Sequence, residues 1–167
     1  MLLGDLSSAM NCKDMQNSPV FKVEARAILL DEKKRVLLGK RAGGMEAGKW
    51  SLIGGKPEEG ESAEEAVKRE VKEEIGLRFE PIFYQKAKGF DKKGGIKWRS
   101  TRFLGDIKST QKLDYDKSEF SEIKFFSSEE LDNLEIAFNH KEILKDFFKN
   151  TKQAKKSGGK LVLIKSK

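Results

Sequence analysis

The sequence predicts a single domain of the α/β class, a sandwich in which a mixed sheet lies between helices. Two observations support this prediction. Short runs rich in β-branched and aromatic residues stand on both sides of one well-marked helix, and a second helical pattern follows the last of these runs. This order of strands, helix, strands and helix is typical of an α/β sandwich. We assign the domain to residues 20–150, between an N-terminal segment (1–19) expected to be flexible and a basic C-terminal tail (151–167).

The first part of the domain predicts two strands joined by a turn. Residues 21–30 (FKVEARAILL) and 36–40 (VLLGK) are rich in strand-forming residues, and the segment DEKKR between them has the charged composition of a turn. Two such runs separated by a short turn favour a β-hairpin. Residues 51–61 (SLIGGKPEEGE) then form a glycine-rich turn.

A helix follows this diglycine segment, and local signals mark both of its ends. Ser62 followed by Glu65 forms the pattern of a capping box, which begins a helix. Gly76 can adopt the positive φ that ends a helix and that other residues resist. On a helical wheel, Val67 and Val71 belong to the face that packs inward.

Three glutamates in this helix lie where a helix normally packs against a core. Glu70 and Glu74 share the face of Val67, and Glu73 lies at its margin. Carboxylates that converge there repel one another and lose hydration, so we expect a cation to compensate them. Hard oxygen ligands favour Mg²⁺ or Mn²⁺ over zinc. Arg69, one turn before Glu73, can pair with it. The alternative is a solvated amphipathic helix with ordinary ion pairs.

The remaining elements complete the predicted sandwich. Residues 79–90 and 96–107 are candidate strands around DKKGG, and residues 123–126 are a further strand. The segment SSEEL opens a short helical turn, and residues 139–149 place apolar side chains at helical spacing.

The segment from Gly55 to Leu77 resembles the signature box of the Nudix hydrolases, with every fixed position filled. The fixed positions of the resemblance are Gly55, Glu61, Arg69, Glu70, Glu73, Glu74 and Gly76. The preceding residues 50–55 (WSLIGG) are similar to the strand and diglycine, here Gly54 and Gly55, that lead into that box in the family, although Ile53 replaces the usual proline. The resemblance implies a Nudix-type α/β/α sandwich with a mixed sheet and a hydrolase that acts on phosphoric anhydride bonds.

The resemblance also implies roles for individual residues. Glu70, Glu73 and Glu74 would bind Mg²⁺ or Mn²⁺, and Glu61 and Gly76 would have structural roles. Glu73, oriented by Arg69, is the expected general base, with Glu70 as the alternative. A further metal ligand often comes from a distant loop in this family, and Glu119 holds the MutT-type spacing to Phe125. The other acids of that loop are Asp114, Asp116 and Glu122.

Substrate contacts are carried over from MutT-type nucleoside triphosphatases. Arg41 matches a substrate-contacting arginine, and Asn139 matches an asparagine that reads a purine edge. Gly54 and Gly55 are also expected to bind the substrate. Asn139 has the alternative role of a helix N-cap. The expected activity is cleavage of a nucleoside diphosphate linked to a variable group, with purine or damaged-purine nucleoside triphosphates as the leading substrates. Alternatives are an ADP-ribose-type pyrophosphatase, an RNA 5′-end pyrophosphohydrolase and a non-enzymatic nucleotide sensor.

Composition indicates a cytoplasmic protein that does not bind membranes. No apolar run approaches the roughly 18 residues of a membrane span. The single cysteine, Cys12, cannot form an internal disulfide, and the only histidine, His140, is expected to be structural. The net charge is +7, and six lysines without an acid stand in the tail. This tail, whose LVLI segment is a candidate strand, attracts polyphosphates or RNA. The oligomeric state stays open, with a homodimer as one possibility.

Overall fold

The computed structural model describes residues 21–90, 97–150, 154–157 and 160–163; the predicted N-terminal segment, with Cys12, lies outside this part of the chain. The elements are β1 (Phe21–Leu30), β2 (Val36–Arg41), β3 (Trp50–Ser51), β4 (Ile53–Gly55), α2 (Ala63–Ile75), β5 (Ile82–Phe90), β6 (Lys97–Asp106), β7 (Phe120–Phe126), the 3₁₀ helix η1 (Glu130–Asn133), α3 (His140–Asn150), β8 (Ala154–Ser157) and β9 (Lys160–Leu163).

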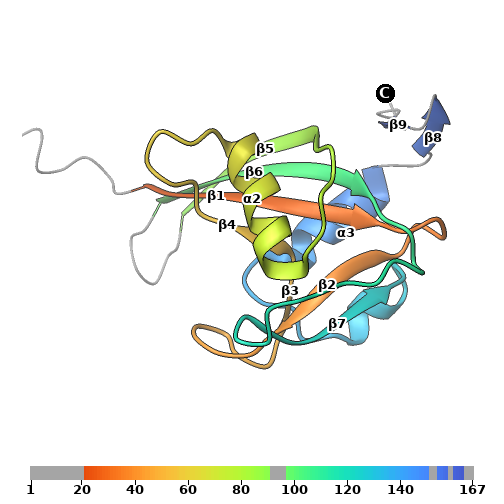
Figure 1. The fold of residues 1–167 in the computed structure, drawn as a ribbon, viewed down its shortest axis with the longest axis horizontal. Coiled ribbons are helices and arrows are strands. Elements are labelled where there is room, and N and C mark those ends of the chain that lie inside the picture. Colours follow the sequence, from red (N-terminus) through yellow and green to blue (C-terminus); the bar gives the residue numbers. More distant parts are fainter. Residues whose placement is uncertain (1–20, 91–96, 151–153, 158–159, 164–167) are drawn as a thin grey trace, which may run out of the picture.

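The principal sheet is mixed. Its strands follow the order β3-β2-β1-β6-β5, with β4 also paired to β1 and β7 also paired to β2 (Figure 1). The long strands β1 and β6 run parallel, from Phe21 opposite Lys97 to Leu30 opposite Asp106. The other pairs of this sheet are antiparallel.

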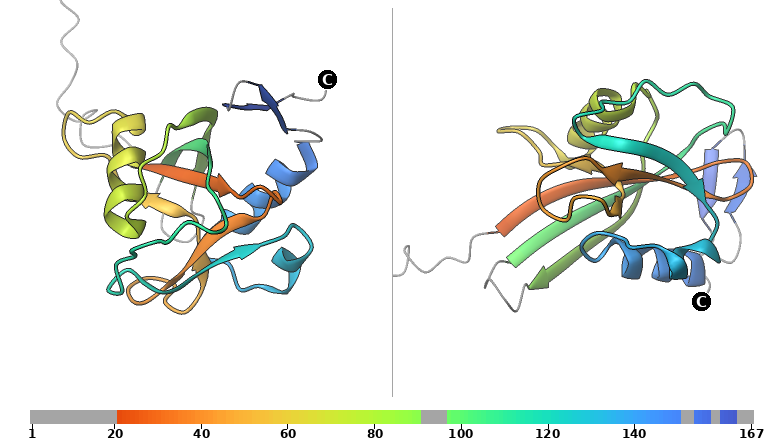
Figure 2. Two further views of the ribbon diagram at one scale, coloured as in Figure 1. Left: turned by 45° about the vertical axis from the view of Figure 1, so that its right-hand side comes forward. Right: turned by 90° about the horizontal axis from the view of Figure 1, so that it is seen from below.

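Helices cover both faces of the sheet. One apolar cluster joins α2 to the side of β1 that carries Ala25, Ala27 and Leu29. A second cluster joins α3 to the opposite side, where Ile28 and Leu30 project. This division follows from the period-2 alternation of side chains in β1. The two helices lie on opposite sides of the sheet in Figure 2, which confirms the predicted α/β/α sandwich.

Strand pairing differs from the predicted hairpin. β1 and β2 are joined by a turn, but their register contains only the pair Leu30 and Val36. Beyond this pair, β1 extends along β6 and β4, whereas β2 pairs with β3 and β7. The turn itself is anchored by the buried Asp31, which accepts hydrogen bonds from the backbone of Lys33 (2.9 Å) and Arg35 (2.8 Å). Local sequence thus predicted the turn but not the strand partners.

Two strand boundaries also differ from the prediction. β5 begins at Ile82 rather than at residue 79, after Pro81, which has no backbone N–H to donate to a sheet. β7 begins at Phe120 rather than at residue 123, because its pairing with β2 continues past exposed residues to Arg41 opposite Phe120. The polar composition of this extension hid it from a search for apolar runs.

The segment predicted as a basic tail contains β8 and β9, which pair in antiparallel orientation. β9 includes three residues of the expected LVLI strand. Among the described helices, none is both long and apolar enough to cross a membrane.

Candidate active site

Helix α2 supplies three of the predicted site glutamates, and its ends are formed as the sequence predicts. The Ser62 side chain accepts from the Glu65 backbone at 3.2 Å, and the Glu65 carboxylate accepts from the Ser62 backbone at 2.9 Å. Gly76 ends the helix at a φ of 69° and donates its N–H to Lys72 at 3.0 Å. The two caps fix where the helix begins and where it ends.

Arg69 is the centre of a cluster of ion pairs on this helix. Its Nε and Nη2 donate to the two oxygens of Glu61 at 2.9 and 3.0 Å, and Nη1 donates to Glu73 at 3.0 Å and Glu70 at 3.1 Å. Nη2 also donates to the carbonyl of Lys56 at 3.0 Å. Arg69 therefore connects the loop after β4 to two site glutamates, and this extends the predicted pair with Glu73.

The two glycines that end β4 allow the backbone to approach α2 and β1 closely. Gly54 has a φ of 127°, and a Cβ there would collide with the carbonyl of Ala25 in β1. A Cβ on Gly55 would overlap the carboxylate of Glu70. The lack of a side chain at both positions therefore brings the backbone against the glutamate face of the helix.

Glu74 is a partly buried site carboxylate. It accepts a hydrogen bond from the backbone N–H of Gly54 at 2.8 Å. Burial raises the pKa of Glu74 to about 8, and the charges of Glu70 and Glu119 act in the same direction, whereas the Gly54 N–H and Arg26 oppose the rise. A carboxyl in this position favours any cation that replaces its proton.

The glutamates line a cavity of about 580 Å³ between α2, the diglycine turn and the loop before β7. Its lining contains acidic and basic side chains, two glycines and one aromatic ring: Arg26, Arg41, Gly54, Gly55, Lys56, Glu70, Glu73, Glu74, Asp116, Glu119 and Phe120. The cavity thus brings together the predicted metal ligands Glu70, Glu73, Glu74 and Glu119 with the predicted substrate residues Arg41, Gly54 and Gly55. Arg69, Glu61 and Gly76 support it from outside.

Backbone contacts position the loop that contributes Glu119. The N–H of Asp116 donates to the Glu74 carbonyl at 2.9 Å, and the Glu119 carbonyl accepts from Ala42 at 2.8 Å. Asp116 and Glu119 therefore line the cavity, whereas Asp114 and Glu122 do not. Glu122 is instead opposite Lys40 in the β2–β7 pair.

The donor set fits a divalent cation, although the carboxylates do not converge in this conformation. Within the described residues, no three acidic or imidazole side chains lie close enough together to form a complete metal site. Arg69 is paired with Glu70 at 3.1 Å and with Glu73 at 3.0 Å. Four glutamates along one cavity wall, one of them with a raised pKa, nevertheless match the all-oxygen ligands of Mg²⁺ or Mn²⁺.

Arg41 and Asn139, the two side chains predicted to contact the substrate, lie in different environments. Arg41 lines the cavity, donates to the Met45 carbonyl at 2.9 Å and stands over the exposed Phe138 ring at 5.2 Å. Asn139 precedes α3, and its carbonyl accepts the Ile143 N–H at 3.1 Å. Asn139 is not among the cavity-lining residues, and no hydrogen bond of its amide is found within the described residues. Its role in base recognition stays a prediction.

His140 has the expected structural environment. It is fully buried, and its Nδ1 accepts the Leu52 N–H at 3.1 Å. Burial lowers the pKa of His140 well below its ordinary range, and nearby arginines reinforce the effect. The imidazole is therefore neutral, carries its proton on Nε2, and attaches α3 to the segment between β3 and β4.

Three cavity residues escaped the sequence analysis: Arg26, Lys56 and Phe120. Arg26 had a detectable signal, since it is a charged residue in the otherwise apolar second half of β1. It pairs with Glu24 at 3.2 Å and donates to the carbonyl of Gly54. Lys56 follows the diglycine, and Phe120 precedes the part of β7 that the apolar pattern marked.

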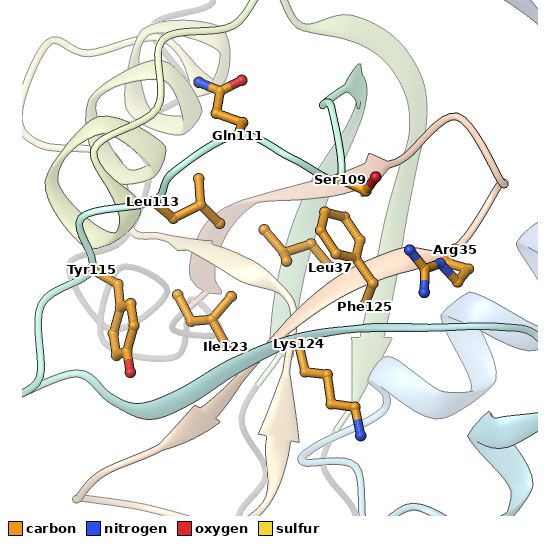
Figure 3. A pocket seen from close by; sticks show the side chains of 9 residues that line it. All are labelled: Arg35, Leu37, Ser109, Gln111, Leu113, Tyr115, Ile123, Lys124 and Phe125. Atoms are coloured by element: carbon orange, nitrogen blue, oxygen red, sulfur yellow. The ribbon is translucent and has the colours of Figure 1, made fainter.

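A second cavity, of about 360 Å³, lies beside β2 and β7 (Figure 3). Leu37, Leu113, Ile123 and Phe125 form its apolar wall, and Lys124 points away from it. Arg35 stands over Phe125 at 5.5 Å and is already paired with the buried Asp31 at 2.7 Å. This cavity has no acidic lining residue, so it lacks the chemistry of the first.

The α/β/α fold and the glutamate-lined cavity are those of the Nudix class of proteins. The model of the NUDIX domain matches residues 20–147, and the chain belongs to the Nudix hydrolase family.

Relatives of known name match shorter parts of the chain. A 55-residue segment is 44% identical to an oxidized purine nucleoside triphosphate hydrolase of Mus musculus, covering 33% of this chain and 35% of that protein. An RNA pyrophosphohydrolase of Teredinibacter turnerae is 42% identical over 62 residues, with 37% and 35% covered. The chain thus spans about a third of the length of these relatives. A MutT protein structure from Methanosarcina mazei Go1 has a TM-score of 0.69 and 26% identity, and the match covers 81% of this chain and 99% of that one.

Proposed function

We propose that this protein is a metal-dependent pyrophosphohydrolase. Its substrate is a nucleoside diphosphate linked to a further group, with purine or damaged-purine nucleoside triphosphates as the leading candidates. The observation that carries the proposal is the cavity in which Glu70, Glu73, Glu74 and Glu119 face Arg26, Arg41 and Lys56. Carboxylates of this kind hold a divalent cation, and the basic side chains bind phosphate oxygens.

The residues that line the cavity have different proposed roles in the hydrolysis of the phosphoric anhydride. Glu70, Glu73, Glu74 and Glu119 would hold Mg²⁺ or Mn²⁺. When bound, the ion neutralises charge on the phosphate oxygens and lowers the pKa of a water molecule. Arg41 and Lys56 orient the phosphate chain in the cavity. Water adds to one phosphorus, the anhydride P–O bond breaks, and a nucleoside monophosphate and pyrophosphate leave.

Glu73 is the proposed acceptor of the proton from the attacking water. Its side chain is 59% exposed at the cavity edge, where water has access, and Arg69 holds it at 3.0 Å. Glu70 is the alternative, since the same Arg69 nitrogen holds it at 3.1 Å and its side chain is 18% exposed. Comparison of the pH–rate profiles of Glu73→Gln and Glu70→Gln separates the two assignments.

The decisive experiment measures hydrolysis of a nucleotide panel with Mg²⁺ or Mn²⁺ and identifies products by phosphorus NMR. We expect monophosphate and pyrophosphate, no turnover in EDTA, and losses of roughly 10²-fold or more in Glu70→Gln and Glu74→Gln. Glu64→Gln, at an exposed position of α2 that is paired with Lys68 (3.1 Å), is the matched control and keeps full activity. Near wild-type turnover in either folded site variant contradicts the metal-site assignment.

An RNA 5′-end pyrophosphohydrolase is the second candidate. It is favoured by the basic tail and by the name of the relative from Teredinibacter turnerae. A triphosphorylated RNA in the same panel tests it directly. Hydrolysis of the RNA, without cleavage of free nucleoside triphosphates, would replace the leading candidate with this one.

A further inference from the structure

Two arginines lie side by side on the α3 face of the central strands. In the parallel register of β1 and β6, Arg26 is opposite Arg102 and Glu24 is opposite Ser100. On the same face, the next residue of β1 after Arg26 is Ile28 and the next residue of β6 after Arg102 is Leu104. Both apolar side chains pack in the cluster around α3. Arg26 lines the glutamate cavity, so Arg102 stands one strand spacing, about 4.8 Å, from the wall of that cavity.

The hydrogen bonds of the two arginines are unequal. Arg26 is paired with Glu24 and also donates to the Gly54 carbonyl. Arg102 is only 6% exposed, yet its one identified partner among the described side chains is the neutral amide of Gln85, at 2.8 Å. No partner for its buried Nε exists within the described residues. The same holds for the hydroxyl of Ser100, a residue that is 1% exposed.

This deficit is unusual for a folded protein. Buried polar groups almost always have a hydrogen-bond partner, and a desolvated cation without one is costly. Burial accordingly lowers the pKa of Arg102. Gln85, which accepts from the other side of the guanidinium, is exposed on β5, so its side chain stands between Arg102 and solvent.

The chemistry of the cluster defines what can complete it. A guanidinium only donates hydrogen bonds, and a serine hydroxyl can donate as well. An oxygen acceptor is therefore favoured, whereas an amino group would bring N–H against N–H. A keto oxygen of a nucleobase has two lone pairs, which suffice for one bond from Arg102 and one from Ser100.

We propose that Arg102 and Ser100 are specificity residues that read a carbonyl oxygen on the base of the nucleotide substrate. This inference rests on the proposed function and refines it, because it predicts a preference for keto bases over their amino counterparts. The phosphate chain would lie in the glutamate cavity, with the base extending past Arg26 onto β6 and β5.

Matched nucleotides test the preference. ITP and ATP differ at the 6-oxo or 6-amino position, and UTP and CTP differ likewise at position 4. We expect kcat/KM of the wild-type protein to favour the keto member of at least one pair by about 10-fold or more. Arg102→Met should reduce that ratio to near one, mainly through KM, and Ser100→Ala should reduce it in part. Arg99→Met, on the opposite face of β6, is the control and keeps the ratio.

Binding measurements separate this inference from the proposed function. Titration calorimetry with IMP and AMP, without metal, should show the same keto preference in the wild-type protein and its loss in Arg102→Met. If Arg102→Met fails to fold, Ser100→Ala decides the matter, because it removes only one hydroxyl. An unchanged keto-to-amino ratio in the folded variants overturns the inference while the hydrolase stands. Absence of hydrolysis across the whole nucleotide panel overturns the proposed function, and the IMP and AMP titrations still decide the role of Arg102.

Discussion

At the residue scale, Glu74 combines burial with a position beside other carboxylates. Its pKa of about 8 lies above the ordinary value of 4.5, with burial as the largest cause. The Gly54 N–H, which donates to it at 2.8 Å, only partly offsets this cost. In the absence of metal, the folded protein therefore holds Glu74 protonated at neutral pH.

This protonation predicts how the stability of the metal-free protein depends on pH. Between pH 4.5 and about 8 the folded state retains a proton that the unfolded chain has lost, so the free energy of unfolding falls as pH rises through this window. Thermal unfolding in EDTA from pH 5 to 8.5 measures the decline. Glu74→Gln, a neutral replacement, should be more stable than wild type at pH 8 and should flatten the curve.

Metal addition provides the complementary measurement. The gain in Tm on adding Mg²⁺ should be larger at pH 8 than at pH 6, because binding displaces the Glu74 proton. Parallel pH curves for wild type and Glu74→Gln would contradict the assigned protonation.

At the element scale, the diglycine joins the sheet to the loop before α2, and its two glycines have different neighbours. Gly54 lies against the backbone of β1, and Gly55 lies against the carboxylate of Glu70. A backbone neighbour cannot move aside, whereas a side chain can. The same methyl group added at adjacent positions should therefore affect stability in one case and activity in the other.

Gly54→Ala should lower the free energy of unfolding by about 3 kcal/mol, since its φ of 127° and the Ala25 carbonyl both oppose a side chain. Gly55→Ala should keep most of the stability but reduce kcat/KM on the order of 10²-fold, because it displaces Glu70. Urea unfolding and steady-state kinetics on both variants check the pair. Equal losses of stability, with activity per folded molecule unchanged, would count against the separation.

At the scale of the whole molecule, charge is distributed unevenly. The chain has a net charge of +7, and six lysines without an acid occur in residues 151–167. The cavity has its own basic side chains, Arg26, Arg41 and Lys56. We therefore expect the lysines of the tail to affect the binding of long polyanions more than that of a mononucleotide.

Replacing the six tail lysines by glutamine separates these contributions. Hydrolysis of a nucleoside triphosphate should stay within about twofold of wild type, whereas affinity for a triphosphorylated RNA should fall and its dependence on salt should flatten, since each lost phosphate contact reduces the slope. Competition binding at several salt concentrations makes the measurement. Equal effects on RNA and mononucleotide would exclude a role of the tail in RNA selection.

The sequence alone determined helix α2 and the arrangement of its charged residues. The capping box at Ser62, the end at Gly76 and the shared face of Glu70 and Glu74 depend only on helical spacing, which is local geometry. The pairing of Arg69 with Glu73, one turn apart, was predictable for the same reason. The existence of most strands followed similarly from their composition.

Only the tertiary structure decided which distant residues meet α2. The parallel partner of β1 is β6, which lies far along the chain, and no local pattern in the sequence specifies that pairing. This pairing places Arg102 beside Arg26, and the path of the loop before β7 brings Asp116 and Glu119, rather than Asp114 and Glu122, into the cavity. The burial that raises the pKa of Glu74 likewise arises from packing against β4. Such contacts depend on the free energy of the whole packed molecule, whereas the helix and its caps depend on neighbours in the chain.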